Sequence, residues 1–422
     1  MFAASDVAAL VNHTREVVHL DDGEIAEITP KGFKVITLDA VAAEKDSVTI
    51  SAEFEEFSRG NHEHFMYKEI LDQPESIART LGGRLDHRFN TAHLGGLNLT
   101  ARELLEIRRI KILGCGTAYY AGKTGADMIE SLARIPCDAE PAAEFRYRKP
   151  VIERDVLYIV VSQSGETFDT LAALRELKRK GGYTLGVVNV VGSTIAREVD
   201  GGIYMHAGAE VSVASTKAYT SMLAVFALLA LHLGRIHDVS PQTGQRLVGA
   251  LNELPAKIEE ALKQEAHIKA LAKKYSHAKS AFFIGRASAF PIALEGAQKL
   301  KEISYIHAEA YPASELKHGP LALVTEEIPT IAVIPDNDLL DKSISSLEEI
   351  KARGGPVITV SNSPDPRLKK LSDDFIEVPQ TEEVLHPIVM GIALQLFAYH
   401  SAGALGRDVD QPRNLAKSVT VE

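Results

Sequence analysis

The sequence predicts an α/β protein made of two tandem, doubly wound parallel-sheet domains, preceded by a partial β-containing segment. Two observations carry this prediction. Short apolar runs typical of strands alternate with stretches of helical spacing, which implies a parallel sheet covered on both faces. The alternation also occurs twice, at an offset of about 170 residues, which indicates a duplication. In such sheets ligands bind beyond the carboxyl ends of the strands, so the loops there are the first candidate sites.

The two halves correspond element by element. Each half has an apolar first strand ending in glycine, a second apolar strand, a helix with basic residues before a Gly-Gly pair, a third strand and a long apolar helix. In that order the matched segments are 110–114 and 281–285, 157–161 and 330–334, 178–182 and 351–355, 185–190 and 357–360, and 222–233 and 388–400. A helical segment at 241–275 joins the halves.

The first 55 residues or so follow another pattern. Strand-like segments at 17–20 and 24–28 flank Asp21-Asp22-Gly23, which predicts a hairpin. This is too little chain for a comfortable independent core. We therefore expect a fragment of a larger β-containing domain or a cap on its neighbour.

Composition excludes several classes of function. A net charge of −11 argues against a nucleic-acid partner. Cys115 and Cys137 are the only cysteines, which fits a reducing compartment, and without a His/Cys cluster they predict no metal site. No apolar run reaches the 18 or so residues of a membrane span, and the N-terminus does not resemble a signal peptide. We expect a cytoplasmic protein with no membrane partner and no cofactor.

Residues 162–167, Ser-Gln-Ser-Gly-Glu-Thr, form the most informative stretch. They follow the apolar run 156–161 and precede a helix-like segment at 171–178. Three hydroxyls, an amide and a glycine thus gather at a helix N-terminus, where free N–H groups and a partial positive charge favour a phosphate. The alternative is an ordinary helix cap, but a cap needs only one hydroxyl. Phosphate binding is the favoured interpretation.

Three further side chains are candidates for proton chemistry. Lys299 and Glu302 share a face of one predicted helix in an apolar neighbourhood, and His318 follows within 20 residues. Taken singly they read as a solvated ion pair and a surface histidine. Together, opposite a phosphate loop, they indicate proton transfer on a sugar phosphate. Lys417, in a C-terminal stretch without regular periodicity, is either a solvated side chain or, if buried, an amine able to form a Schiff base.

These motifs resemble the glutamine–fructose-6-phosphate aminotransferase (isomerizing) family, which makes glucosamine 6-phosphate in amino-sugar biosynthesis. The resemblance covers essentially the whole chain. The tail and the 299–309 stretch separate this family from other sugar isomerase (SIS) proteins. The shared segments are 144–148, 162–167, 213–218, 299–309, 315–320 and 408–422.

The resemblance implies roles for the candidate residues. Lys417 would form an imine with the open ketose, Glu302 would shuttle a proton between C1 and C2, and Lys299 would assist. His318 would catalyse ring opening in the site of a neighbouring subunit, so a homodimer is expected. The sugar phosphate would be bound by Ser162, Gln163, Ser164 and Thr167, with Thr117 and Ser215 nearby.

The resemblance also implies a domain division. Two SIS subdomains are expected, with a tail that closes over the site. The expected segments are a type-2 glutamine amidotransferase remnant at 1–58, a helical linker at 59–103, SIS subdomains at 104–236 and 277–405, a helical connector at 237–276 and the tail at 406–422.

Two departures from the family pattern bear on activity. The family's glutaminase domain begins with a catalytic cysteine after the initiator methionine, whereas Phe2 follows Met1 here. The expectation is that ammonia comes from solution or from a separate glutaminase. Ala118 stands where the family commonly has a serine, so one hydroxyl contact to the substrate is expected to be missing.

Three alternative functions stay open from the sequence. The chain would only isomerise fructose 6-phosphate to glucose 6-phosphate, would act on a different sugar or as a deaminating SIS enzyme, or would be a non-catalytic sugar-phosphate sensor. A sensor usually carries a basic helix-turn-helix domain, and none is visible. It would also have no use for Glu302, His318 and Lys417 together.

Overall fold

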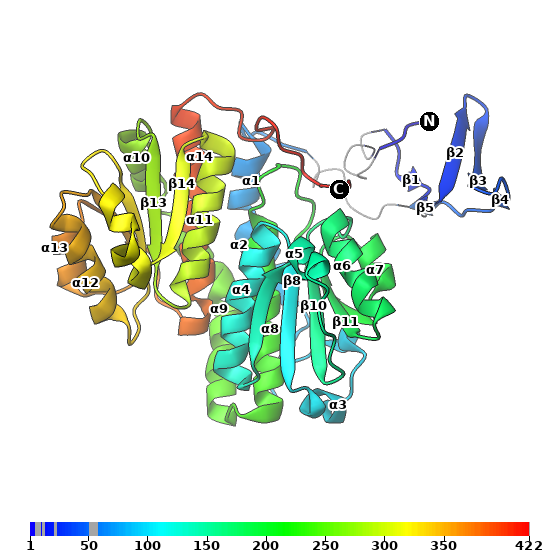
Figure 1. Ribbon diagram of the computed structural model, residues 1–422, viewed down its shortest axis with the longest axis horizontal. Helices are drawn as coiled ribbons and strands as arrows, with labels where there is room; N and C mark the ends of the chain where they lie inside the picture. Colours follow the sequence, from blue (N-terminus) through cyan, green and yellow to red (C-terminus); the bar gives the residue numbers. More distant parts are fainter. Residues whose placement is uncertain (5–9, 11–12, 21–22, 50–57, 422) are drawn as a thin grey trace. The chain divides into compact units, whose positions relative to one another are not determined.

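The computed structural model describes residues 1–4, 10, 13–20, 23–49 and 58–421. They form two compact units, Met1–Glu63 and His64–Glu422. The predicted division into a β-containing N-terminal part and a larger α/β part is visible in Figure 1.

The N-terminal unit contains two small antiparallel sheets. β2 (Glu24–Thr29) pairs with β3 (Gly32–Thr37), which pairs with β4 (Ala42–Ala43), while β1 (Glu16–Val17) pairs with β5 (Val48–Thr49). The hairpin predicted across Asp21–Gly23 is therefore wrong, although Asp21 and Asp22 themselves lie outside the described residues. The hairpin forms one strand later, because Thr29 closes its turn through Lys31 N–H and Gly32 C=O.

The first α/β domain holds a five-stranded parallel sheet in the order β12-β11-β10-β8-β9. Its strands are β8 (Arg109–Gly114), β9 (Cys137–Pro141), β10 (Val156–Ser162), β11 (Tyr183–Val188) and β12 (Gly201–Tyr204). Leu157, Ile159 and Val161 of β10 face one core, and Val156, Tyr158 and Val160 face the other. A strand buried on both faces explains the unbroken apolar run in the sequence.

The second α/β domain repeats this topology. Its parallel strands lie in the order β14-β13-β15-β16-β17, which is the order of the first sheet strand for strand. They are β13 (Ser280–Gly285), β14 (His307–Pro312), β15 (Thr330–Ile334), β16 (Val357–Ser361) and β17 (Asp374–Glu377). The identical order confirms the predicted duplication and the doubly wound architecture.

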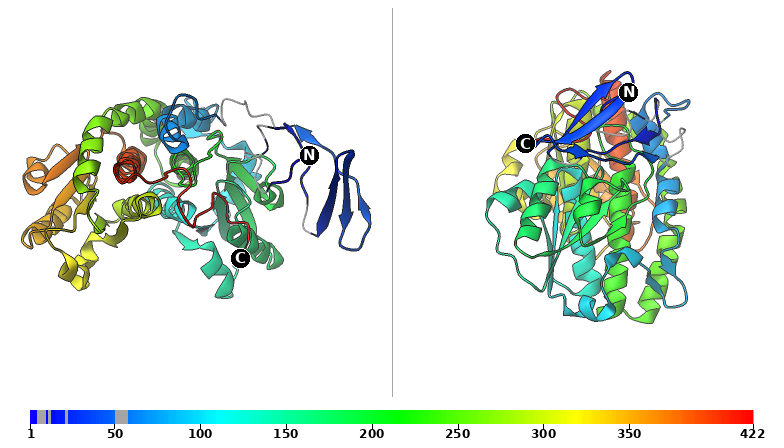
Figure 2. Two further views of the ribbon diagram at one scale, coloured as in Figure 1. Left: turned by 90° about the horizontal axis from the view of Figure 1, so that it is seen from above. Right: turned by 90° about the vertical axis from the view of Figure 1, so that its right-hand side faces the viewer.

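Helices cover both faces of each sheet, as Figure 1 and Figure 2 show. In the first domain they are α4 (Thr117–Ala133), α5 (Ala142–Tyr147), α6 (Phe168–Arg179), α7 (Thr194–Glu198) and α8 (Lys217–His237). In the second they are α11 (Ala289–Ser304), α12 (Leu340–Lys351), α13 (Pro366–Leu371) and α14 (His386–Ala404), with short 3₁₀ turns η4 (Ala313–His318), η5 (Pro320–Leu323) and η6 (Glu383–Leu385).

The remaining elements flank the domains. They are α1 (Phe65–Leu71), α2 (Gln73–Leu81), β6 (Leu85–Asp86), β7 (Thr91–Ala92), η3 (Gly95–Leu97) and α3 (Ala101–Glu106) before the first sheet, and α9 (Pro241–Leu262) and α10 (Glu265–Tyr275) between the domains. The helical connector expected at 241–275 is thus present as two helices.

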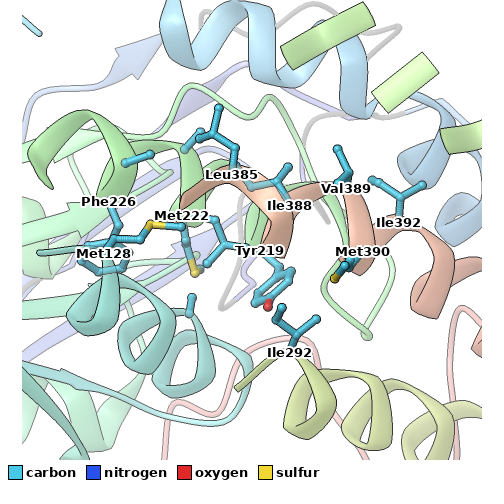
Figure 3. Close-up of a cluster of buried hydrophobic side chains, with 14 of the residues drawn as sticks. Met128, Tyr219, Met222, Phe226, Ile292, Leu385, Ile388, Val389, Met390 and Ile392 are labelled. Atoms are coloured by element: carbon cyan, nitrogen blue, oxygen red, sulfur yellow. The ribbon is translucent and has the colours of Figure 1, made fainter. Parts of the chain in front are cut away.

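The two α/β domains share one hydrophobic core between their sheets. Figure 3 shows α4, α8, α11 and α14 contributing to it, with Tyr219 and Met222 of α8 beside Ile292 of α11 and Met390 of α14. Since the cluster is continuous across the domains, their relative position is fixed by close packing. A site built from loops of both domains is consequently held rigidly.

Among the described residues, two segments are long and apolar enough to cross a membrane by length and composition, α8 and Glu383–Ala404. Of their most apolar 18-residue windows, 83% and 94% respectively are buried inside the protein. Their apolar character is accounted for by the shared core.

Candidate active site

The candidate site lies at β8 of the first sheet, because the next strands along the chain, β9 and β10, lie on opposite sides of β8. β8 and β10 are neighbouring parallel strands, with Leu113 opposite Val160, and the connections from their carboxyl ends run to α4 and α6. A crevice at this switch point is the usual ligand position in doubly wound sheets. Cys115 Sγ lies 3.6 Å from Thr170 Oγ1 on α6, so the two loops lie side by side.

The loop 162–167 is folded by its own hydroxyls. Ser162 Oγ accepts a hydrogen bond from Gly165 N–H at 3.0 Å and lies 2.9 Å from Thr167 Oγ1. Ser164 Oγ accepts from Glu166 N–H at 3.1 Å. Gly165 has φ +69°, and a Cβ there would lie 2.0 Å from Ser193 Oγ, so only glycine fits. The predicted strand–loop–helix is confirmed, and hydroxyls and N–H groups gather before α6.

A second cluster joins the two domains. On α11, Lys299 Nζ donates to Glu302 Oε2 at 2.6 Å and lies 3.4 Å from Glu295 Oε1. It also donates to Oγ1 of Thr117, the first residue of α4, at 3.1 Å. Thr117 in turn donates to Glu295 Oε1 at 3.2 Å. The structure therefore places Thr117 against the ion pair, rather than among the hydroxyls of loop 162–167.

Burial sets the electrostatics of this cluster. Lys299 is 1% exposed, whereas Glu302 is 17% exposed and reaches the surface of the site. Burial alone lowers the pKa of Lys299, but the carboxylates of Glu295 and Glu302 outweigh it and hold the pKa above its usual value. Burial raises the pKa of Glu295 to about 7. Lys299 is thus a permanent cation beside the one carboxylate that faces outward.

The other Glu302 oxygen is also held. Gln298 Nε2 donates to Glu302 Oε1 at 2.7 Å, one helical turn away. A carboxylate fixed by an ammonium on one oxygen and an amide on the other has a defined orientation, which suits a group that moves a proton between two atoms.

Lys417, in the C-terminal tail, is partly buried. Its side chain is 18% exposed and Nζ donates to Glu210 Oε2 at 2.5 Å, while the Glu210 side chain is fully buried. The sequence left open whether Lys417 is buried, and the structure shows that most of its side chain is. Burial by itself raises the pKa of Glu210, but the Lys417 charge and its hydrogen bond outweigh burial and hold that pKa below its usual value.

Hydrogen bonds along its length anchor the tail. Asp410 accepts from the N–H groups of Phe65 and Met66 at 2.8 and 2.9 Å and so caps α1. Arg413 N–H donates to the hydroxyl of Tyr305 at 2.9 Å. Near the end, Val419 C=O accepts from Phe168 N–H, the first residue of α6, at 2.9 Å. In Figure 1 the tail leaves α14, passes α1 and ends beside α6.

Two predicted residues are not joined to these clusters. His318 ends η4 and is exposed, and within the described part of the chain no hydrogen bond or ion pair connects it with Lys299, Glu302 or Lys417. Ser215 precedes α8, and its buried Oγ has no hydrogen-bond partner there. A buried hydroxyl without a partner is unusual, so Ser215 is able to accept or donate to a ligand. Ala118 is buried in the first turn of α4 and supplies no hydroxyl.

Sequence reasoning missed Glu210, Gln298 and the capping role of Asp410. Gln298 lies four residues before Glu302, and this helical spacing was a usable signal. Glu210 meets Lys417 and Asp410 meets α1 through contacts 207 and about 345 residues apart along the chain, which no local pattern reveals.

Comparisons with known proteins agree with this geometry. The SIS domain family profile matches residues 103–232 and 274–405, the two parallel-sheet domains. The chain is 47% identical over 422 residues to a glutamine–fructose-6-phosphate aminotransferase (isomerizing) of Thermus thermophilus, and 46% identical over 424 residues to that of Escherichia coli K12. Each match covers 100% of this chain and 69% of the relative.

Solved structures point the same way. The C-terminal domain of glucosamine-fructose-6-phosphate aminotransferase from Francisella tularensis superimposes with a TM-score of 0.79 and 39% identity, covering 84% of this chain and all of that chain. A glucosamine-6-phosphate deaminase from Thermotoga maritima gives a TM-score of 0.64 at 21% identity, covering 84% of this chain and 99% of that chain, which shows a shared fold alone.

Proposed function

The chain belongs to the glutamine–fructose-6-phosphate aminotransferase (isomerizing) family and carries its pair of SIS domains, and we propose that its site works on fructose 6-phosphate as follows. The sugar phosphate lies between loop 162–167 and the Lys299–Glu302 pair, with Lys417 at its C2. One observation carries this proposal: Thr117 of the first domain and Lys299 of the second meet directly at the switch point of the first sheet. Since Thr117 and the phosphate loop follow the neighbouring strands β8 and β10, this contact supports placing the phosphate loop and the proton-transfer pair in one site.

We assign phosphate binding to the loop before α6. Ser162, Ser164 and Thr167 present hydroxyls beside the N-terminus of a 12-residue helix, and Gln163 is the fourth expected ligand. Ser215, with its unpartnered hydroxyl, is the natural additional contact. Most of the binding energy comes from neutral donors, which suits a protein with net charge −11.

Isomerisation requires one proton to move between neighbouring carbons. In the open-chain ketose, Glu302 removes a proton from C1 while the C2 oxygen takes up a proton, which gives an enediol. Glu302 then returns its proton to C2 while the C1 hydroxyl releases one, which leaves the aldehyde of the aldose. The Lys299 ammonium holds the Glu302 carboxylate in place and stabilises the negative charge that develops on the sugar.

Nitrogen transfer follows from an imine between Lys417 and C2 of the open ketose. Ammonia adds at C2 and displaces the Lys417 amine, and the C1-to-C2 proton transfer then gives glucosamine 6-phosphate. We propose ammonia as the immediate nitrogen donor. We assign residues 1–58 to the last part of a glutamine amidotransferase domain, supported by relatives whose alignment includes these residues and extends over only 69% of their own length.

Ring opening is proposed for His318 acting in a second copy of the chain. Its exposed position at the end of η4, apart from both clusters of its own chain, supports a role at a neighbouring site. The working unit is then a homodimer. The free cysteines Cys115 and Cys137 support a reducing, intracellular location.

Product analysis tests the proposal. Purified protein is incubated with fructose 6-phosphate, with and without ammonium. Glucosamine 6-phosphate with ammonium supports the full proposal. Glucose 6-phosphate in both arms supports isomerisation and removes amination. Binding of the sugar phosphate without either product would favour a sensor and overturn the assignment of Glu302.

A further inference from the structure

We propose that Glu210 is the proton acceptor that converts the Lys417 ammonium into a nucleophilic amine. The inference rests on the proposed imine at Lys417 and adds a catalytic residue to it. Its basis is the direct contact of a fully buried carboxylate with the reacting nitrogen, at 2.5 Å.

The two oxygens of Glu210 have separate tasks. Oε1 accepts from the N–H groups of Thr216 and Ala218, at 2.8 and 3.0 Å, at the start of α8. These bonds fix the carboxylate and leave Oε2 to Lys417 alone among the described residues. The helix N-terminus holds the carboxylate in place, while Oε2 points at the amine that must lose a proton.

Charged groups from three elements interact with Glu210. They are Lys417 of the tail, Glu69 of α1 and Lys299 of α11, while Lys217 of α8 interacts with Glu69. Lys217 is itself paired with Asp72 at 3.4 Å. Burial and the neighbouring Glu210 raise the pKa of Glu69 to about 8, so Glu69 is neutral below that pH. Glu210 is then the ionised carboxylate in contact with Lys417.

Exclusion of water by the bound sugar drives the proton transfer from Lys417 to Glu210. The Lys417 side chain is 18% exposed, and a sugar can approach it from this exposed side. When a sugar excludes water there, the ion pair of Lys417 and Glu210 loses solvation. The neutral pair of carboxylic acid and amine then becomes more favourable relative to the ion pair. Because the two atoms are already in hydrogen-bond contact, the proton moves without a rearrangement of the protein.

The step balances in atoms and charge. The ammonium gives a proton to Glu210, and the free amine adds to the C2 carbonyl, whose oxygen takes up the proton that the attacking nitrogen then releases, to form a carbinolamine. Glu210 returns its proton to the departing hydroxyl, which leaves as water. The products are a protonated imine and an ionised Glu210, so the positive charge of the imine ends beside a carboxylate that stabilises it.

A purely structural role for Glu210 predicts a different behaviour. The substitution Glu210→Gln keeps an acceptor oxygen for the N–H groups of Thr216 and Ala218. If Glu210 had only a structural role, the protein would therefore tolerate this substitution. A missing base instead changes how imine formation depends on pH. Without an internal acceptor, the reaction proceeds only through the fraction of Lys417 already deprotonated, which rises about tenfold per pH unit below the pKa of the amine.

The experiment is single-turnover imine trapping. Purified wild-type protein, Glu210→Gln and Glu69→Gln are mixed with fructose 6-phosphate and cyanoborohydride from pH 6 to 9, and labelled Lys417 is quantified by peptide mass spectrometry. Glu69→Gln is the matched control, because it mimics the neutral form of a neighbouring buried carboxyl that does not touch Lys417. Melting temperature and protection by fructose 6-phosphate check that each variant folds and binds.

We expect wild type and Glu69→Gln to trap at similar rates below pH 8 with a shallow pH profile. Glu210→Gln should be slower by about 100-fold at pH 7 and recover steeply as pH rises. Glu210→Asp, which keeps a carboxylate on a shorter stem, should show a smaller loss with the shallow profile. Glu210→Ala, which lacks a carboxylate, replaces Glu210→Gln if the latter does not fold.

Two results would overturn the inference, and they differ. If the wild type labels Lys417 and Glu210→Gln, or Glu210→Ala in its place, keeps the wild-type rate and profile, Glu210 is not the base and the proposed function stands. If the wild type never labels Lys417 although the sugar phosphate binds, the imine itself is wrong and the inference falls with it.

Discussion

Lys299 on α11 donates a hydrogen bond to Thr117 at the start of α4, with 3.1 Å between Nζ and Oγ1. The two residues belong to different SIS domains, so the ion pairs of α11 have a hydroxyl partner from the first domain. The shared core of α4, α8, α11 and α14 fixes the relative position of the two residues.

Replacing Glu302 by glutamine should abolish isomerisation and leave sugar-phosphate binding nearly intact. The amide keeps the shape of the side chain but cannot take a proton from C1, so we expect turnover to fall by about 100-fold or more. Coupled assay of glucose 6-phosphate and calorimetric binding of fructose 6-phosphate check this. Glu309→Gln is the control, a partly exposed carboxylate of the same domain. Retained turnover in Glu302→Gln would remove it from the mechanism.

Replacing Ser162 by alanine should weaken binding of the sugar phosphate. The change removes the hydroxyl that bonds Gly165 N–H and Thr167, so the loop loses both a phosphate donor and an internal support. A hydrogen bond to a charged group corresponds to an affinity loss of about 10- to 100-fold. Ser345→Ala on α12, an exposed hydroxyl far from the loop, should change nothing. Equal affinities for both variants would contradict the phosphate assignment.

Replacing Asp410 by asparagine should loosen the tail that carries Lys417. Asp410 caps α1 with two charge-assisted hydrogen bonds, and loss of the charge should lower stability by about 1 kcal/mol. Hydrogen exchange at residues 411–421 should accelerate, and turnover should fall. The matched control is Asp365→Asn, which removes a cap from α13. An unchanged tail exchange rate in Asp410→Asn would show that the cap does not hold the tail.

Glu69 should make stability depend on pH. Its pKa in the folded protein is about 8, above the ordinary value of 4.5, so between these values the folded state holds a proton that the unfolded state releases. Stability therefore falls as pH rises through this window, by at most about 1.4 kcal/mol per pH unit. Urea unfolding of Glu69→Gln should lack this decline. The exposed Glu259→Gln should retain it, and parallel curves for wild type and Glu69→Gln would refute the assignment.

Local patterns predicted the fold because the strand, loop and helix signals in the sequence all indicate the same architecture. The apolar strand 157–161, its polar exit and the helix after it recur in the second half, and the sheets show one strand order. The N-terminal hairpin was misplaced because the turn signal Asp21-Asp22-Gly23 competes with Thr29, whose side chain closes the next turn.

The site was predictable where its members share one helix or loop, and not where they meet through the tertiary fold. Lys299 and Glu302 are one helical turn apart, so their contact follows from spacing. Glu210 reaches Lys417 from a loop before α8, and its burial depends on α1, α8 and the tail together. The hydrogen bond of Thr117 with Lys299 was not predictable from sequence, since the packing of α4 against α11 decides where its hydroxyl points.

The central claim is that Glu302 carries a proton between C1 and C2 of the bound sugar. The most direct test follows the conversion of fructose 6-phosphate by the purified protein in D₂O and reads the product by NMR. The account predicts glucose 6-phosphate that retains the C1-derived protium at C2 despite the D₂O solvent, formed by the wild type and lost in Glu302→Gln. No conversion despite binding, or equal conversion by Glu302→Gln, would contradict it.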